Sequence, residues 1–398
     1  MIGETLIFFS FQFILFVSIF FLGYEIFLKT KLRLFYISIM SLCFYLFFAG
    51  VGATFLLSIA GLGTYICLKL RSSSIMLIWI SFLLIILVGF KYFLELPFFA
   101  NNQLLKAQFG SPDNLRLLAP LGLSFFLFEF IHLMIEKRRN PSLVENLGFL
   151  RFAAFSFFWP TIVAGPIKRI DNFDPLPELQ DRYSRYFRGL SLILLGFIYK
   201  YFGDLFKSLS DPYSLGLESL SRLQAFFLIA LLGLRIFFDF AGYSLLAIGF
   251  ARAMGISVPQ NFRAPYMSSS ITDFWNRWHI SLSSWIRDYI YISLGGNRVT
   301  NFRLIFNLLI TMALCGAWHG SSWNFVVWGF YHGILLSLHR LVKIHFPTKL
   351  LRKSLHVTVL NLGKILLTQF FVFMGWVFFF FPLNDGFTIF RAILLGAP

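Results

Sequence analysis

The chain has 398 residues, of which 58% are hydrophobic and only 13% are charged, and its mean hydropathy is +0.75. A soluble domain carries about 25% charged residues, because its surface lies in water. The composition therefore excludes an ordinary soluble protein and predicts an all-α, polytopic membrane protein. The net charge of +16 does not indicate nucleic-acid binding, because its basic residues form short clusters between apolar runs, as in cytoplasmic loops, at 29–33, 69–71, 136–139 and 349–353.

Apolar runs long enough to cross a bilayer recur along the whole chain. A spanning helix needs about 20 apolar residues, and on that scale we predict about eleven spans. The run at 34–68 is long enough for two short helices with a turn near Gly50, and the segment 101–113 suits an outside loop. The other spans are expected at 6–28, 75–94, 117–135, 190–206, 223–250, 305–318, 323–338 and 357–381.

The apolar segment 149–163 breaks this simple alternation. Basic residues flank it on both sides, Lys168 and Arg169 among them, so both flanks are expected on the cytoplasmic side. Pro160 and Pro166 would interrupt a continuous helix, and irregular backbone is tolerated at membrane depth only where protein or water surrounds it. We therefore predict a re-entrant element beside a cavity. Because no linker or internal repeat divides the chain, we predict one domain over 1–398.

The segment 268–294 is too polar to face lipid. On a helix, Asp273 and Arg277 are four residues apart and pair on one face. A second face carries His279, Ser283 and Arg287, and this amphipathic segment is expected to line a polar cavity or to lie at the interface. The alternative is a purely interfacial helix with three headgroup anchors, Trp275, Trp278 and Trp285.

A histidine follows the apolar run 304–318. That run would span roughly 22 Å as a helix, against a hydrocarbon core of about 30 Å, so His319 is expected below the outer surface. A partly desolvated histidine suits general-base chemistry, although a structural hydrogen-bonding role fits the sequence equally well. For His332 a structural role is favoured. The sequence has no Gly-x-Ser-x-Gly elbow, which favours direct transfer to a hydroxyl over a covalent acyl-enzyme.

Several longer motifs, in a consistent order, resemble the membrane-bound O-acyltransferase family over residues 120–391. The match is strongest to the bacterial branch that includes alginate O-acetyltransferase and peptidoglycan acetylating proteins. The motifs lie at 164–167, 238–244, 261–266, 270–283, 287–289, 294–298 and 316–320, with Trp323 and Trp328 following.

The resemblance implies many helices around a central tunnel that links the two membrane faces. It also implies that His319 is the active-site base and that His279 is the second active-site residue. No metal is expected. The remaining residues expected to line the tunnel or contact substrate are Trp318, Trp275, Asn276, Arg277, Asp288, Asp239, Ser283 and Trp323.

The resemblance further implies an acyltransferase in the bacterial inner membrane, without a bound cofactor. It would move an acyl group, by default acetyl, from acetyl-CoA or another acyl thioester toward hydroxyls of an extracytoplasmic polysaccharide, through a partner acetyltransferase. One alternative is a D-alanyl transferase of the teichoic acid type, which the short stretch after the last matching segment resembles, whereas 295–298 favour the acetyl branch. Leu245 is a further departure from the alginate-type motif, which commonly carries a polar residue there. The alternative from another class is a transporter or flippase that uses Arg235, Asp239 and Asp273.

Overall fold

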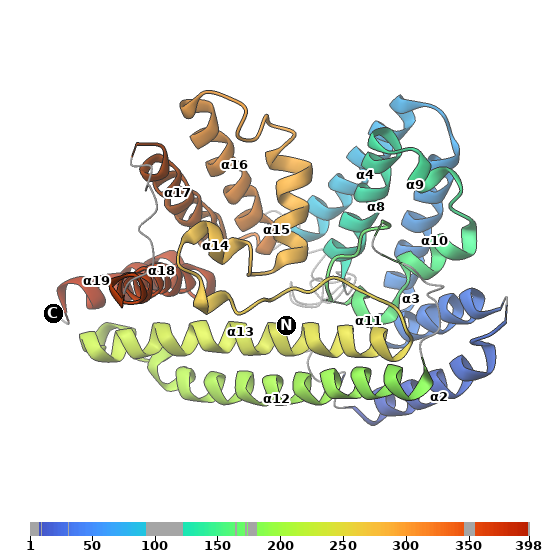
Figure 1. The fold of residues 1–398 in the computed structure, drawn as a ribbon, viewed down its shortest axis with the longest axis horizontal. Coiled ribbons are helices and arrows are strands. Elements are labelled where there is room, and N and C mark those ends of the chain that lie inside the picture. The colour runs from blue at the N-terminus through green and yellow to red at the C-terminus, as the bar shows by residue number, and fades with distance from the viewer. Residues whose placement is uncertain are drawn as a thin grey trace, which may run out of the picture. The chain divides into compact units, whose positions relative to one another are not determined.

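The computed structural model describes residues 8, 10–30, 32–92, 122–163, 165–171, 173, 181–345 and 355–396. Every regular element in these residues is a helix, which confirms the all-α prediction (Figure 1). The α-helices are α2 (Phe11–Phe27), α3 (Arg33–Lys69), α4 (Ser73–Tyr92), α8 (Leu123–Arg139), α9 (Ser142–Glu145), α10 (Phe149–Ser156), α11 (Trp159–Ile162), α12 (Arg182–Ser214), α13 (Arg222–Ala253), α14 (Ile271–Trp275), α15 (Ile280–Ile286), α16 (Asn301–His319), α17 (Trp323–His345), α18 (Leu355–Phe380) and α19 (Leu383–Leu395). Two 3₁₀ turns, η2 (Leu217–Ser219) and η3 (Pro265–Met267), and a π-helical turn, η4 (Arg287–Tyr291), complete them.

Seven of the described helices are long and apolar enough to cross a membrane, namely α3, α4, α12, α13, α16, α17 and α18. Large apolar side chains on these helices are exposed, as expected of lipid-facing surfaces rather than surfaces in water. The chain is therefore a multi-pass membrane protein. The count of about eleven spans stays a prediction, and the loop predicted at 101–113 lies outside the described residues.

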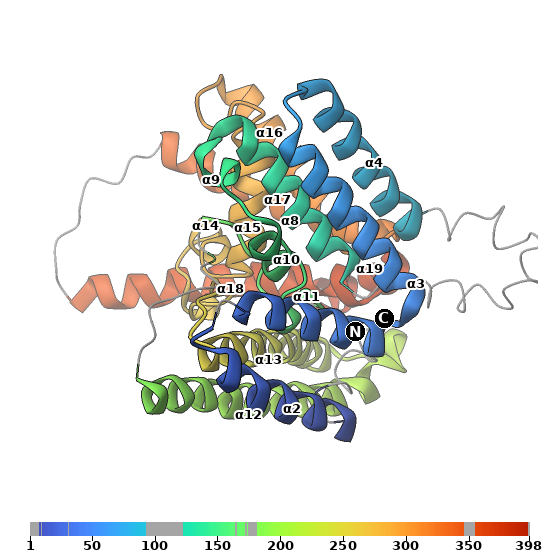
Figure 2. The same cartoon turned by 90° about the vertical axis from the view of Figure 1, so that its right-hand side faces the viewer.

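Helix α3 is bent at Gly50, where the sequence predicts a turn. Gly50 has φ 85° and ψ 171°, a conformation open to glycine because it has no Cβ. The two halves of α3 leave this point in different directions (Figure 2). The 37 residues would extend about 55 Å if straight, well beyond one bilayer crossing, and the bend divides them into two shorter pieces.

The segment predicted to be re-entrant folds into two short helices, α10 and α11, with a break at Phe157. The eight residues of α10 rise about 12 Å, far too little to cross a bilayer. Trp159 on α11 is enclosed by phenylalanine rings with centroids 5.1–6.0 Å away: Phe13, Phe16, Phe20, Phe44 and Phe250. Protein thus surrounds this irregular backbone, and its re-entrant course in the membrane stays a prediction.

The described chain divides into two compact units, one of 1–194 with 244–259 and the other of 195–243 with 260–398. Helices α12 and α13 contribute to both units, and the single domain of 1–398 stays a prediction. Helices α12 and α13 run side by side (Figure 1), and within each unit glycines lie where they meet. A Cβ at Gly249 would lie 2.9 Å from the Gly189 carbonyl oxygen, and one at Gly242 would lie 2.9 Å from that of Gly196.

The α16–α17 hairpin carries His319 at the end of its first helix. Helix α17 contains two glycines four residues apart, Gly329 and Gly333, the spacing that lets membrane helices approach closely, and α16 contains Gly316. A methyl group at Gly316 would come within 2.1 Å of the Phe325 carbonyl oxygen, and one at Gly329 within 2.2 Å of that of Met312. Backbone contact between the two helices therefore fixes the position of the end of α16, which carries His319.

We expect Gly316→Ala to destabilise the hairpin by about 1–3 kcal/mol, because the new methyl group meets a backbone oxygen that has no room to move. Gly363→Ala, in α18, is the matched control, since no atom lies within 4 Å of a Cβ there. Thermal unfolding of both variants in detergent measures the difference. Equal unfolding temperatures would show that the backbones are not held this closely.

Candidate functional site

His319 stands at the last position of α16, half-buried among aromatic rings. Its ring centroid lies 4.6 Å from that of Trp318, 5.2 Å from Trp328 on α17 and 5.0 Å from Phe379 on α18. The Trp328 contact is edge-to-face, with an angle of 89° between the planes. Three helices of one unit thus position this imidazole.

His279 lies in a sharp turn and not on the continuous helix that the sequence predicts. Helix α14 ends at Trp275 and α15 begins at Ile280, and His279 between them has φ 43° and ψ 52°. This left-handed conformation is unfavourable for a residue with a Cβ, so the surroundings must hold it. The helical prediction was wrong here because it considered only local spacing.

The backbone around His279 is held by the preceding segment. The Ile280 amide donates to the Asn261 carbonyl at 2.9 Å, and the Arg263 amide donates to the Arg277 carbonyl at 3.0 Å. The Asn261 side-chain oxygen also accepts from the Ser281 hydroxyl at 2.6 Å. This pairing of 261–263 with 277–281 is a tertiary constraint that sustains the strained turn.

The His279 side chain is 2% exposed and packs against aromatic side chains of the site. Its ring centroid lies 4.6 Å from Phe240 and 6.1 Å from Trp318, so both histidines contact the Trp318 ring. Burial lowers the pKa of His279 to about 3, which keeps the imidazole neutral at physiological pH. Its buried Nε2 has no hydrogen-bond partner among the described residues, which is rare for a buried polar atom.

The predicted pair of Asp273 and Arg277 is confirmed, with Arg277 Nε, just beyond the end of α14, 2.8 Å from Asp273 Oδ1. The anchor interpretation is wrong for two of the three tryptophans, since Trp278 and Trp285 are buried within the protein. Trp275 also packs inward, with its ring centroid 5.8 Å from that of Trp328.

The remaining residues predicted to line the tunnel or contact substrate do not gather at one place in the structure. Asp239 forms an ion pair with the buried Lys200 of α12, Asp288 pairs with its neighbour Arg287 at 2.8 Å, and the Ser283 hydroxyl donates to the Trp278 carbonyl. Two side chains stay out of the aromatic cluster: Asn276 is exposed, and Trp323, at the start of α17, is 73% exposed. Their roles as tunnel or substrate contacts stay predictions.

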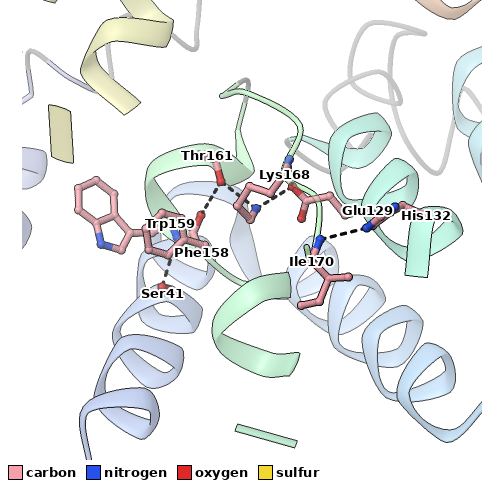
Figure 3. Close-up of polar contacts among 8 residues, drawn as sticks. All are labelled: Ser41, Glu129, His132, Phe158, Trp159, Thr161, Lys168 and Ile170. Atoms are coloured by element: carbon pink, nitrogen blue, oxygen red, sulfur yellow. Dashed lines mark hydrogen bonds and ion pairs between the residues drawn. The ribbon is translucent and has the colours of Figure 1, made fainter. Parts of the chain in front are cut away.

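A buried charged network in the other unit is absent from the sequence expectations. Lys168 Nζ lies 2.6 Å from Glu129 Oε1 and donates to the Thr161 hydroxyl at 2.8 Å (Figure 3). The side chains of Lys168 and Glu129 are 1% and 3% exposed. Beside them, the Ile170 amide donates to His132 Nε2 at 3.0 Å.

Lys168, counted in the sequence among the basic residues that flank 149–163, is thus buried in an ion pair. A linear cluster of charges does not show that one member has a carboxylate partner 39 residues earlier. The available signal was Glu129, an acidic residue inside the apolar run predicted at 117–135, since such a residue in a membrane segment is expected to be paired.

We expect His279→Gly to lower the transfer rate of the folded protein by about 10- to 100-fold, the loss typical of a misplaced reacting group. Glycine tolerates the left-handed turn, so this variant removes the imidazole without adding backbone strain. His279→Ala should show the same rate and unfold at a lower temperature. A wild-type rate in His279→Gly would contradict a role for this side chain in transfer.

Comparison with known proteins agrees with the motifs that meet in this site. A model of the membrane-bound O-acyltransferase family matches residues 34–383. The chain is 37% identical over 282 residues to the probable alginate O-acetylase AlgI of Azotobacter vinelandii, covering 69% of this chain and 51% of that protein. It is 33% identical over 325 residues to the peptidoglycan O-acetyltransferase of Helicobacter pylori, covering 74% and 59% of the two chains.

A third relative is named for the transfer of a different acyl group, D-alanyl. The teichoic acid D-alanyltransferase of Bacillus subtilis is 31% identical over 283 residues, covering 67% of this chain and 70% of that protein. The chain spans about half the length of the alginate relatives that it matches.

Proposed function

This chain belongs to the membrane-bound O-acyltransferase family, and we propose that it transfers an acyl group from a thioester donor to a hydroxyl, with His319 as the general base. The observation that carries this proposal is the meeting of His319 and His279 at the Trp318 ring. Both side chains come from separate family motifs, and the fold brings them to one aromatic cluster. Such a cluster excludes water, which strengthens polar interactions within it.

In the proposed reaction the acceptor hydroxyl oxygen attacks the carbonyl carbon of the donor thioester. An imidazole nitrogen of His319 takes the hydroxyl proton as the new C–O bond forms. The C–S bond then breaks, and the proton passes to the departing thiolate. His319 suits this exchange because a neutral imidazole has one acceptor nitrogen, which can take the hydroxyl proton and then release it.

His279 has a different task in this scheme. A neutral imidazole offers one N–H donor and one acceptor nitrogen, and the His279 Nε2 atom has no partner among the described residues. We assign it to orienting the acyl carbonyl or the acceptor hydroxyl, because a rigid, strained turn holds it in place. A fixed donor at a developing oxyanion stabilises the transition state without reorganisation.

The acyl group that we propose is acetyl, delivered from acetyl-CoA on the cytoplasmic side of the bacterial inner membrane. Two of the relatives above are named for O-acetyl transfer, and the local motif at 295–298 resembles that branch. The acceptor would be an extracytoplasmic polysaccharide, reached through a partner acetyltransferase and through the tunnel that the family resemblance implies. D-alanyl transfer is the alternative, in view of the teichoic acid relatives.

The transporter or flippase alternative is disfavoured by the family match, which supports acyl transfer. The charges on which that alternative relies are all paired: Asp239 forms an ion pair with Lys200, Asp273 lies 2.8 Å from Arg277, and Arg235 lies 3.5 Å from Asp211.

A donor-competition assay tests the proposed function. Membranes that contain the chain receive radiolabelled acetyl-CoA or a radiolabelled D-alanyl carrier thioester, and label on protein or polysaccharide is counted. We expect label from acetyl-CoA alone. Label from the D-alanyl donor alone would replace the acetyl assignment, and label from neither donor in the presence of the acceptor and partner fraction would contradict acyl transfer.

A further inference from the structure

His332 on α17 is a fully buried histidine that the proposed chemistry does not use. Its side chain is 0% exposed, and neither Nδ1 nor Nε2 has a hydrogen-bond partner among the described residues. Buried polar atoms without partners are rare, because they lose their bonds to water and gain nothing in return. The loss calls for a compensating contact from the neighbouring side chains.

The rings of His332, Trp275 and Trp328 all contact one another. The His332 centroid lies 5.3 Å from that of Trp275, with an angle of 89° between the planes, and 5.1 Å from that of Trp328, with an angle of 66°. The two tryptophan centroids are 5.8 Å apart. An imidazole edge carries a polarised N–H group, so near-perpendicular contacts with indole rings are more favourable for it than for a phenyl edge.

This set of rings, His332, Trp275 and Trp328, continues directly to the proposed base. Trp328 lies edge-to-face on His319 at 5.2 Å and is itself almost completely buried. On the opposite side, a Cβ at Gly375 of α18 would lie 2.9 Å from His332 Nε2, so the imidazole has no room to turn toward that helix. Any shift of His332 would therefore pass to Trp328 and from there to His319.

We infer that His332 is a positioning residue for acyl transfer: its ring fixes Trp328, which in turn holds the His319 imidazole in its reactive orientation. This inference rests on the proposed function, because it assumes that His319 is the base. It assigns His332 no contact with substrate. It also explains why the second glycine of α18, Gly375, lies against the histidine ring.

The test compares two replacements of His332 in the full-length membrane protein. His332→Leu keeps the volume roughly but removes the planar ring, and we expect kcat per folded molecule to fall about 10- to 100-fold with KM unchanged, as for a misplaced catalytic group. His332→Phe restores a ring with a weaker edge, and we expect kcat within about threefold of wild type. His345→Leu is the control, since that exposed histidine of α17 bonds only within its own turn.

A second variant leaves His332 itself in place. Gly375→Ala presses a methyl group against Nε2, and we expect it also to lower kcat with KM unchanged. The inference is overturned if His332→Leu and Gly375→Ala reduce only the yield of folded protein, or if His332→Phe is as slow as His332→Leu. If His319→Ala keeps transfer intact, the proposed function fails instead, so the two failures are distinguishable.

Discussion

Replacing His319 by alanine is expected to lower the transfer rate about 10²- to 10⁴-fold, the contribution typical of a positioned general base. The hydroxyl acceptor is a weak nucleophile until its proton is removed, and in the proposed reaction His319 removes it. Phe379, Trp328 and Trp318, which surround His319, have no basic group in this pH range. Initial rates with a radiolabelled donor, normalised to folded protein in the membrane, measure the loss.

His319→Ala should remain folded, because His319 is only half-buried and the hairpin is fixed by Gly316 and Gly329 instead. His345→Ala, at the exposed end of α17, is the matched histidine control and should keep the wild-type rate. A folded His319→Ala protein with a wild-type rate would refute its role as the base. If His279→Gly abolishes transfer and His319→Ala does not, the roles of the two histidines are reversed.

The second large effect concerns stability. Lys168→Met leaves the Glu129 carboxylate buried without its cation, and breaking such a pair is expected to cost about 3–5 kcal/mol of unfolding free energy. Glu129→Leu likewise leaves the Lys168 ammonium group buried without a counter-charge, because the Thr161 hydroxyl that it contacts is neutral. Each single variant should therefore unfold at a much lower temperature in detergent.

The double variant Glu129→Leu with Lys168→Met distinguishes the cost of an unpaired buried charge from the cost of altered packing. Replacing a whole buried pair by apolar side chains is often neutral or stabilising, so most of the lost stability should return. Reversible unfolding or thermal scans of the four proteins give the coupling energy. Single variants as stable as wild type would mean that water or another group already compensates these charges.

Features that depend on local sequence were predictable. Long apolar runs predicted spanning helices, and Gly50 predicted the bend in α3, because each property belongs to one stretch of chain. The same holds for the ion pair of Asp273 and Arg277, whose four-residue spacing brings the charges to one side of a single turn.

Features that depend on distant contacts were not predictable from spacing. The turn at His279 exists because 261–263 pair with 277–281, which no helical pattern encodes. Lys168 looks like a loop residue until the fold places Glu129 against it. Trp323 carries the family pattern, yet its position at the first residue of α17 leaves it exposed.

The most direct test of acyl transfer by this chain is the incorporation of label from radiolabelled acetyl-CoA into membranes that contain it. Wild-type membranes should label protein or polysaccharide, and His319→Ala membranes with equal amounts of folded protein should not. Label in both would contradict the central role of His319. No label in wild-type membranes, with the acceptor and partner fraction present, would contradict acetyl transfer itself.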